Sequence, residues 1–80
     1  MKKFEELVWL LHSIKDKDAL ESYLQGLTTA HERRALSRRL EIIKKLKTGK
    51  TQHEVANELR VGVATVTRWS KETARFKSLK

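Results

Sequence analysis

The sequence predicts a small all-α domain of about five helices with a C-terminal helix-turn-helix, and three observations carry this prediction. Apolar residues recur at helical spacing along most of the chain. There is no proline and glycine occurs only three times, which leaves little material for β-hairpins. The segment from Thr51 to Ser70 shows a capped helical pattern, an interruption at Gly62 and a second helical pattern, an order typical of a helix-turn-helix.

Length and composition narrow the class of protein. Eighty residues suit one domain, near the lower limit for a chain that is stabilised by burial alone. The absence of cysteine excludes disulfides and thiolate metal sites. We expect a soluble, cytoplasmic protein, because no apolar run approaches the roughly 20 residues of a membrane span. Glu5 and Glu6 also interrupt the N-terminal stretch that superficially resembles a signal peptide.

The first predicted helix covers residues 3–14. Its residues from Leu7 to Leu11 are apolar at every position, which is more than a full turn. A helix that is apolar all round has to be buried on more than one side. A single chain of this size can hardly cover it, so we expect an interface between subunits there. The alternative is that Trp9 and Leu10 are simply half-exposed in a monomer.

Two further helices are expected before the helix-turn-helix. Asp16 or Asp18 can cap a short helix that ends near Gly26. A long helix then covers residues 30–48, and Gly49 can adopt the left-handed conformation that is common just after a helix end. The apolar stripe expected along this long helix consists of Leu36, Leu40, Ile43 and Leu46, widened by Ile42.

Two pairs of residues have the spacing of a capping box, in which each side chain bonds to the backbone amide of the other residue. These pairs are Thr29 with Glu32 and Thr51 with Glu54. The first pair opens the long helix, and the second opens the helix-turn-helix. We expect the last helix to continue beyond Ser70 into the tail.

The chain is strongly basic, with 18 Lys and Arg against 10 Asp and Glu and a formal net charge of +8 at pH 7. Five of the ten acidic residues lie within the first 21 positions, so the basic excess accompanies the long helix and the helix-turn-helix. Such a charge attracts polyanions and makes binding dependent on salt. A lysine-rich face is usually only solvated, but beside a helix-turn-helix it is the expected phosphate-contacting surface.

A set of residues across the long helix and the helix-turn-helix occurs in a characteristic order. These residues are Thr29-x-x-Glu32-Arg33-x-Ala35-Leu36-x-x-Arg39, the stop at Gly49, Asn57-Glu58-Leu59, and Gly62-Val63-Ala64-Thr65-Val66-Thr67-Arg68. The pattern covers roughly residues 27–72 and resembles the bacterial tryptophan repressor family. The resemblance implies an intertwined homodimer whose first three helices build a shared core. It further implies a single domain over residues 1–80, with dimerisation helices in 1–49 and a DNA-reading head in 50–77.

The second helix of a helix-turn-helix lies in the major groove, with its N-terminal residues against base edges. This selects Val63, Ala64 and Thr67 as groove-facing residues, while Val66 points inward as a core residue. Methyl and hydroxyl groups can contact a thymine methyl or bond to base edges, partly through water. The further candidates for contacts with phosphates or bases are Lys50, Gln52, His53, Arg60 and Lys71.

No catalytic or metal site is expected. The sequence has no nucleophile–base set, no phosphate-binding loop and no metal cluster, and its three histidines lack the spacing of metal ligands. For His53, a plain surface position is the competing interpretation. The expected partners are therefore double-stranded DNA and a second copy of the chain, without a membrane.

The resemblance also implies a corepressor pocket. In the family, tryptophan binds between the long helix and the recognition helix, and its contacts carry over to Thr29, Arg39, Thr65 and Arg68. Tryptophan-responsive members have a glycine directly after this arginine, where the present chain has Trp69. We expect the Trp69 indole to occupy the place of the free amino acid and to stack on Arg39 or Arg68. No cofactor would then be needed; the competing interpretation is an ordinary core residue.

The predicted function is that of a sequence-specific DNA-binding regulator, a repressor that acts on a palindromic operator as a dimer. The alternatives are a tryptophan-responsive repressor, the detached head of a transposase or recombinase, and a helical protein-binding adaptor or antitoxin. Affinity for DNA with a steep salt dependence distinguishes the DNA-binding proteins from the adaptor. The family normally has a further C-terminal helix, whereas only about ten residues follow Ser70 here.

Overall fold

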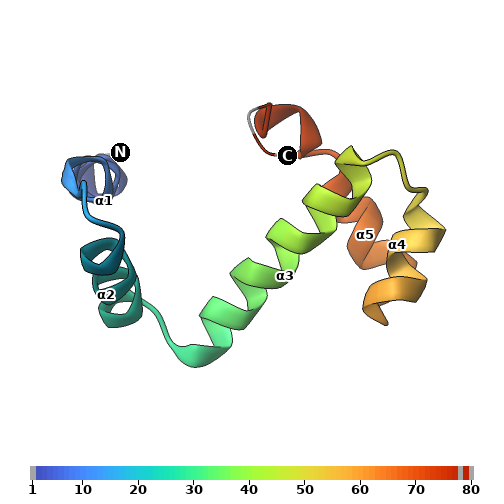
Figure 1. The fold of residues 1–80 in the computed structure, drawn as a ribbon, viewed down its shortest axis with the longest axis horizontal. Helices are drawn as coiled ribbons and strands as arrows, with labels where there is room; N and C mark the ends of the chain where they lie inside the picture. Colours follow the sequence, from blue (N-terminus) through green and yellow to red (C-terminus); the bar gives the residue numbers. More distant parts are fainter. Residues whose placement is uncertain (1, 78, 80) are drawn as a thin grey trace. The chain divides into compact units, whose positions relative to one another are not determined.

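The computed structural model describes residues 2–77 and 79. Its elements are α1 (Lys2–Ser13), α2 (Lys17–Leu27), α3 (Ala30–Lys47), α4 (Gln52–Leu59), α5 (Val63–Ser70) and the short 3-10 helix η1 (Thr73–Arg75) (Figure 1). None of the described residues forms a strand, so the prediction of an all-α chain with a C-terminal helix-turn-helix is confirmed. The chain forms two compact units, Met1–Arg33 and Arg34–Lys80, whose boundary falls within α3. Among the described helices, none has the length and apolar character needed to cross a membrane.

The first unit contains α1, α2 and the start of α3. Asp16 caps α2, because its side chain accepts a hydrogen bond from the Ala19 amide at 2.9 Å. At the other end of this helix, Arg33 Nη1 donates to the Thr28 carbonyl at 2.8 Å and to the Gln25 carbonyl at 3.2 Å. These bonds satisfy carbonyl groups that a helix end leaves without an intrahelical partner. Local side-chain bonds therefore fix both ends of α2.

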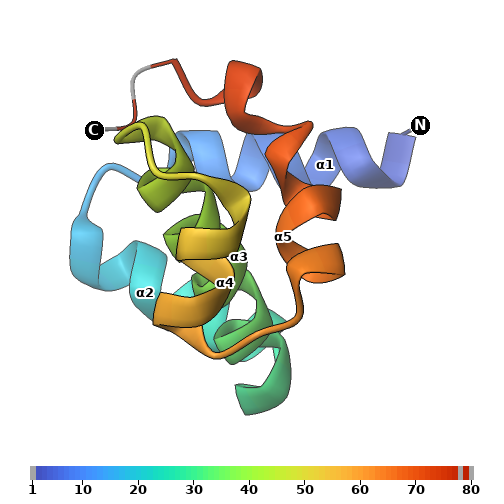
Figure 2. The same cartoon turned by 90° about the vertical axis from the view of Figure 1, so that its right-hand side faces the viewer.

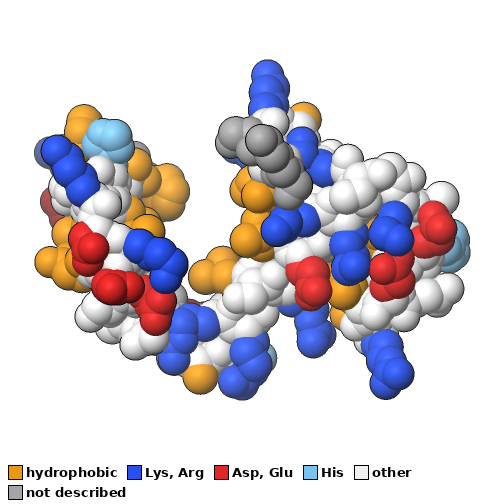
Figure 3. All heavy atoms as spheres, viewed as in Figure 1, with side chains coloured by type: hydrophobic (Ala, Val, Ile, Leu, Met, Phe, Trp, Pro, Cys, Tyr) orange, Lys and Arg blue, Asp and Glu red, His pale blue; other side chains and the backbone are white. Residues whose placement is uncertain are grey.

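Apolar side chains of the first unit are largely exposed. The exposed fraction reaches 68% for Trp9 and 59% for Phe4, and none of the described residues of α1 or α2 is buried. The other large apolar residues exposed in this unit are Leu7, Val8, Leu10, Tyr23, Leu24 and Leu27. Figure 3 shows such apolar side chains on the surface of the helices at the N-terminal end of the chain. Burial of apolar surface stabilises a protein by about 25 cal/mol per Å², and these side chains largely forgo that stabilisation in the single chain.

The hydrophobic core lies in the second unit, where α4 and α5 pack together and against the C-terminal half of α3 (Figure 2). Ile42 of α3, Val55 of α4 and Val66 of α5 are fully buried. The side chains that complete or flank this cluster are Ala56, Leu46, Leu59, Val61 and Trp69. The inward position expected for Val66 is confirmed. Three helices thus meet at branched side chains, which fixes the orientation of the helix-turn-helix on α3.

The buried face of α3 differs from the expected stripe. Leu36 and Leu40 are 50% and 42% exposed, whereas Ile42, expected only to widen the stripe, is fully buried. Residues two apart on a helix lie roughly 200° apart around its axis. Because α4 and α5 pack on the side that carries Ile42, Leu40 is left on another side of the helix.

Both predicted capping boxes are present. The Thr29 amide donates to Glu32 Oε1 at 2.8 Å, and the Glu32 amide donates to Thr29 Oγ1 at 3.1 Å. The Thr51 and Glu54 pair has the same two distances. The amide and hydroxyl of the threonine stabilise the charged carboxylate, so the pKa values of Glu32 and Glu54 are lowered. The starts of α3 and α4 are therefore fixed by their own side chains.

The turns around α4 depend on two residues with positive φ. Gly49, at φ 96°, follows α3 as predicted. Between α4 and α5 the left-handed residue is Arg60, at φ 56°, while Gly62 has the extended conformation of an N-cap. The turn expected at Gly62 therefore begins two residues earlier. A left-handed conformation costs a residue with a side chain about 1–2 kcal/mol. The two hydrogen bonds that the Arg60 and Val61 amides donate to the Ala56 carbonyl offset this cost.

The prediction that the last helix continues beyond Ser70 is wrong. Residues 71 and 72 form a turn, and η1 follows. Thr73 Oγ1 donates to the Ser70 carbonyl at 3.1 Å, and Arg75 Nε pairs with Glu72 Oε1 at 2.9 Å. Threonine hydroxyls that bond to the backbone compete with continued helical bonding. The tail therefore turns back as a short 3-10 segment instead of extending α5.

Candidate nucleic-acid interface

The start of α5 presents the three residues predicted to face the groove. Val63, Ala64 and Thr67 are all exposed, whereas Val66 between them is buried. Gly62 at the N-cap provides no capping side chain. The core holds the Val66 side of α5 in place, while the exposed Val63, Ala64 and Thr67 offer methyl and hydroxyl groups next to the exposed Arg68. Such methyl and hydroxyl groups suit base edges better than phosphates.

Gln52 makes contacts within the protein that sequence patterns did not predict. Its Oε1 accepts from Thr67 Oγ1 at 2.5 Å, and its Nε2 donates to Ser70 Oγ at 3.3 Å. Ser70 Oγ in turn donates to the Thr67 carbonyl at 2.6 Å. The Gln52 side chain is half-buried and bridges the first turn of α4 to the last two turns of α5. No helical periodicity signals this bridge, because fifteen or more positions separate the partners.

Lys50 is held by an ion-pair network between α3 and α4. Its Nζ lies 2.9 Å from Glu58 Oε2, and Lys45 Nζ lies 3.1 Å from Glu58 Oε1. The hydrogen bond from Lys50, and to a lesser extent the one from Lys45, lowers the pKa of Glu58. The hydrogen bond between Lys50 and Glu58 also raises the pKa of Lys50. Lys50 was predicted as a DNA contact, and the structure shows that it also has an internal partner.

The remaining DNA-contact candidates are exposed. His53 lies in the first turn of α4, Arg60 at the end of α4 and Lys71 directly after α5. In Figure 3, Lys and Arg side chains are spread over the visible face of the second unit among a few acidic ones. All eight predicted DNA-contact residues therefore come from α4, α5 and their flanking positions.

Two guanidinium groups lie within cation–π distance of the Trp69 indole. The Arg39 Cζ atom is 4.6 Å from the ring centroid, and the Arg68 Cζ atom is 5.1 Å from it. A guanidinium over an indole within about 6 Å is attracted by the ring's negative face. The sequence predicted stacking on one arginine or the other, and the structure has both. Trp69 is half-buried and also packs against the core, so the indole is held on several sides.

The other two residues of the predicted ligand pocket have different surroundings. Thr65 is exposed on α5. Thr29 belongs to the first unit, where its hydroxyl caps α3. Arg39, Thr65, Arg68 and Trp69 all belong to the second unit.

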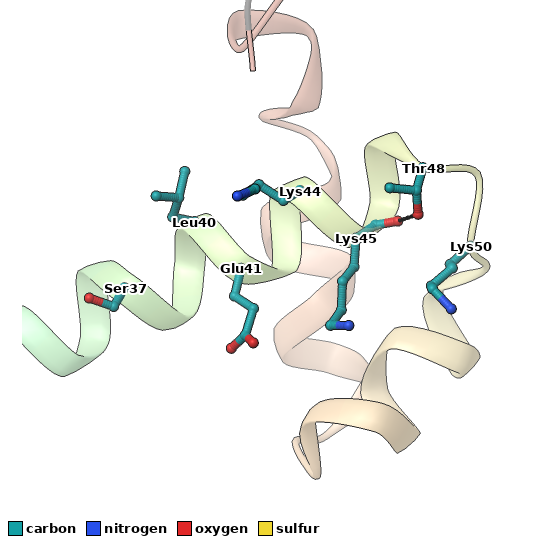
Figure 4. A pocket seen from close by; sticks show the side chains of 7 residues that line it. All are labelled: Ser37, Leu40, Glu41, Lys44, Lys45, Thr48 and Lys50. Atoms are coloured by element: carbon teal, nitrogen blue, oxygen red, sulfur yellow. Dashed lines mark hydrogen bonds between the residues drawn. The ribbon is translucent and has the colours of Figure 1, made fainter. Parts of the chain in front are cut away.

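Two pockets lie beside α3 in the second unit. The first, of about 270 Å³, adjoins Trp69 and is lined by Leu36, Arg39, Leu40, Ile43, Trp69, Glu72, Arg75 and Phe76. Residues of the tail line one part of this pocket, which a continued α5 helix, as predicted, does not indicate. The second, of about 470 Å³, is lined by Ser37, Leu40, Glu41, Lys44, Lys45, Thr48 and Lys50 (Figure 4). It is an open surface hollow, and two of its lysines are paired with Glu58.

Comparisons with known proteins agree with this arrangement. The model of a family described as Trp repressor protein matches residues 2–77. A Trp operon repressor homolog of Vibrio campbellii is 36% identical over 72 residues, which cover 89% of this chain and 72% of that protein. A Trp operon repressor homolog of Vibrio parahaemolyticus is 36% identical over 70 residues, 86% of this chain and 68% of that protein. The uncharacterized protein YerC of Bacillus subtilis is 30% identical over 67 residues, which cover 84% of this chain and 64% of that protein. No solved structure matches the chain.

Proposed function

The chain belongs to the Trp repressor family of DNA-binding transcriptional regulators, and from this premise we propose that it is a sequence-specific repressor that binds a palindromic operator as a homodimer. The family is one of regulators rather than enzymes. The observation that supports the proposal most is the exposed start of α5, whose inner face is fixed in the core by Val66. Basic residues at the ends of α4 and α5 supply phosphate contacts around it. A dimer would present two such surfaces to two half-sites.

Selection of DNA fragments by the purified chain tests this function. We expect a palindromic consensus and an affinity that falls steeply with salt, with a slope of about −0.9 per phosphate contact. Ala64→Glu should weaken operator binding on the order of 100-fold, because a carboxylate would lie against the DNA. Ala74→Glu makes the same charge change at an exposed position of η1 and should cost only a few-fold. Equal losses in both variants, or no selected sequence, would contradict the proposal; the second result favours the protein-binding adaptor.

Operator binding is further proposed to proceed without free tryptophan. The support is the position of the Trp69 indole, which stacks on Arg39 and Arg68, the two arginines assigned to the ligand by family resemblance. An indole that is part of the chain carries no entropic cost of association, so the head would be ordered before it meets DNA.

Calorimetric titration with L-tryptophan tests this independence. The wild type should show no binding in the micromolar range, and its affinity for the operator should be the same with and without the amino acid. Trp69→Gly should open the space and gain tryptophan binding, whereas Trp69→Phe keeps an aromatic ring there and should not. Circular dichroism of each variant confirms that the helices are retained. Micromolar binding to the wild type would instead identify a tryptophan-responsive repressor.

A further inference from the structure

Thr67 is the only one of the three groove-facing residues with a polar side chain, so its hydrogen-bonding capacity matters for base recognition. Its Oγ1 lies 2.5 Å from Gln52 Oε1 and 3.0 Å from the Val63 carbonyl oxygen. Both neighbours are acceptors, and a threonine hydroxyl carries a single hydrogen. That hydrogen therefore points to an acceptor inside the protein. Towards a ligand outside the protein, the hydroxyl can therefore act only as a hydrogen-bond acceptor, through the lone pairs of Oγ1.

The Gln52 amide is oriented by a second contact. Ser70 Oγ donates its own hydrogen to the Thr67 carbonyl at 2.6 Å, so towards Gln52 it can only accept, and Gln52 Nε2 donates to it at 3.3 Å. With its nitrogen on Ser70, the amide turns its oxygen to Thr67. If the amide were reversed, the Thr67 hydrogen would still be bonded to the Val63 carbonyl. The hydroxyl therefore faces outward as an acceptor in either orientation.

The major-groove edges of the bases differ in what they offer to such an acceptor. Adenine N6 and cytosine N4 are amino donors, whereas guanine O6 and N7 and thymine O4 are acceptors. We propose that Thr67 accepts a hydrogen bond from an adenine or cytosine amino group in the operator, and that Gln52 is a positioning residue that reinforces this polarity together with the Val63 carbonyl. This inference rests on the proposed function and adds to it the class of base that Thr67 recognises.

Base analogues test the inference with the full chain and its selected operator. Each adenine or cytosine of a half-site is replaced in turn by purine or 2-pyrimidinone, which lack the amino group. At one position, we expect this change to weaken binding of the wild type and of Thr67→Ser by about 3- to 10-fold, as for one neutral hydrogen bond. Thr67→Val keeps the shape of the side chain but lacks the hydroxyl, so the base analogue should weaken its binding only by the cost of the altered base pair. The wild type also bears that cost, and a double-mutant cycle subtracts it.

Gln52→Leu provides the second arm, with melting temperature as the check on folding. Without the Gln52 oxygen, the Val63 carbonyl alone holds the Thr67 hydrogen, at 3.0 Å, so the hydroxyl turns its hydrogen outward more readily and the preference for an amino base at that position should weaken. Coupling of Thr67 to thymine O4 or guanine O6, or no coupling at any base, would overturn the inference while leaving the repressor proposal intact. If no operator is selected at all, both proposals fail.

Discussion

Ile42→Ala is expected to destabilise the second unit by about 2–5 kcal/mol, the range for truncating a large buried aliphatic side chain. Ile42 is fully buried and is the contribution of α3 to the cluster that holds Val55 and Val66. Its truncation removes apolar contacts and leaves a cavity between three helices. Domains of this size are stabilised by only about 5–15 kcal/mol, so much of the population would unfold at moderate denaturant. Urea unfolding followed by circular dichroism measures the change.

Val63→Ala is the matched control for this truncation. Val63 is 38% exposed on α5, and alanine has the higher helix propensity. The Val63→Ala substitution should therefore change the free energy of unfolding by less than about 0.5 kcal/mol, as is usual for surface sites. A similar loss in both variants, or a negligible one in Ile42→Ala, would show that α4 and α5 are not held on α3 through Ile42.

Leu7→Asp combined with Leu10→Asp is expected to abolish the proposed dimer. The two side chains lie three apart on α1, and both are exposed in the single chain. Carboxylates buried in an apolar interface without partners cost several kcal/mol. In sedimentation equilibrium the wild type should have twice the 9.3 kDa of one chain, and the double variant that of one chain. Operator affinity should fall by about 100-fold or more, since a monomer cannot hold two half-sites together.

Ser13→Asp combined with Ser22→Asp makes the same change of charge at exposed polar positions of α1 and α2. This control should remain a dimer and bind the operator as the wild type does. A monomeric wild type, or a dimeric Leu7→Asp/Leu10→Asp variant, would contradict the assignment of α1 to the interface. Either outcome would favour the alternative that Trp9 and its neighbours are simply half-exposed.

Features of the fold that depend on neighbouring residues could be predicted from the sequence. The two capping boxes, the left-handed Gly49 and the order of five helices all follow from spacings of a few residues, and the structure confirms them. The family could also be predicted, because its motif is a set of residue types in a fixed order along roughly residues 27–72 and needs no knowledge of packing. The assigned DNA contacts and the division into residues 1–49 and 50–77 stay predictions.

Features that depend on packing between distant segments could not be predicted. The apolar period of α3 does not indicate which side of the helix α4 and α5 cover. It therefore cannot show that Ile42 is buried more deeply than Leu40. Arg60 adopts a conformation usually taken by glycine, because the helices on either side impose the turn. The bridge from Gln52 to Thr67 and the return of the tail depend on polar contacts without periodicity.

The contact of the Trp69 indole with Arg39 and Arg68 has a consequence for what controls the activity of this protein. A dissociable ligand lets the concentration of a metabolite set the fraction of active molecules. A side chain, in contrast, is present once per chain whatever the cell is metabolising. Under the proposed function, occupancy of the operator would then follow the number of protein copies. The regulator would report its own synthesis and degradation rather than a nutrient supply.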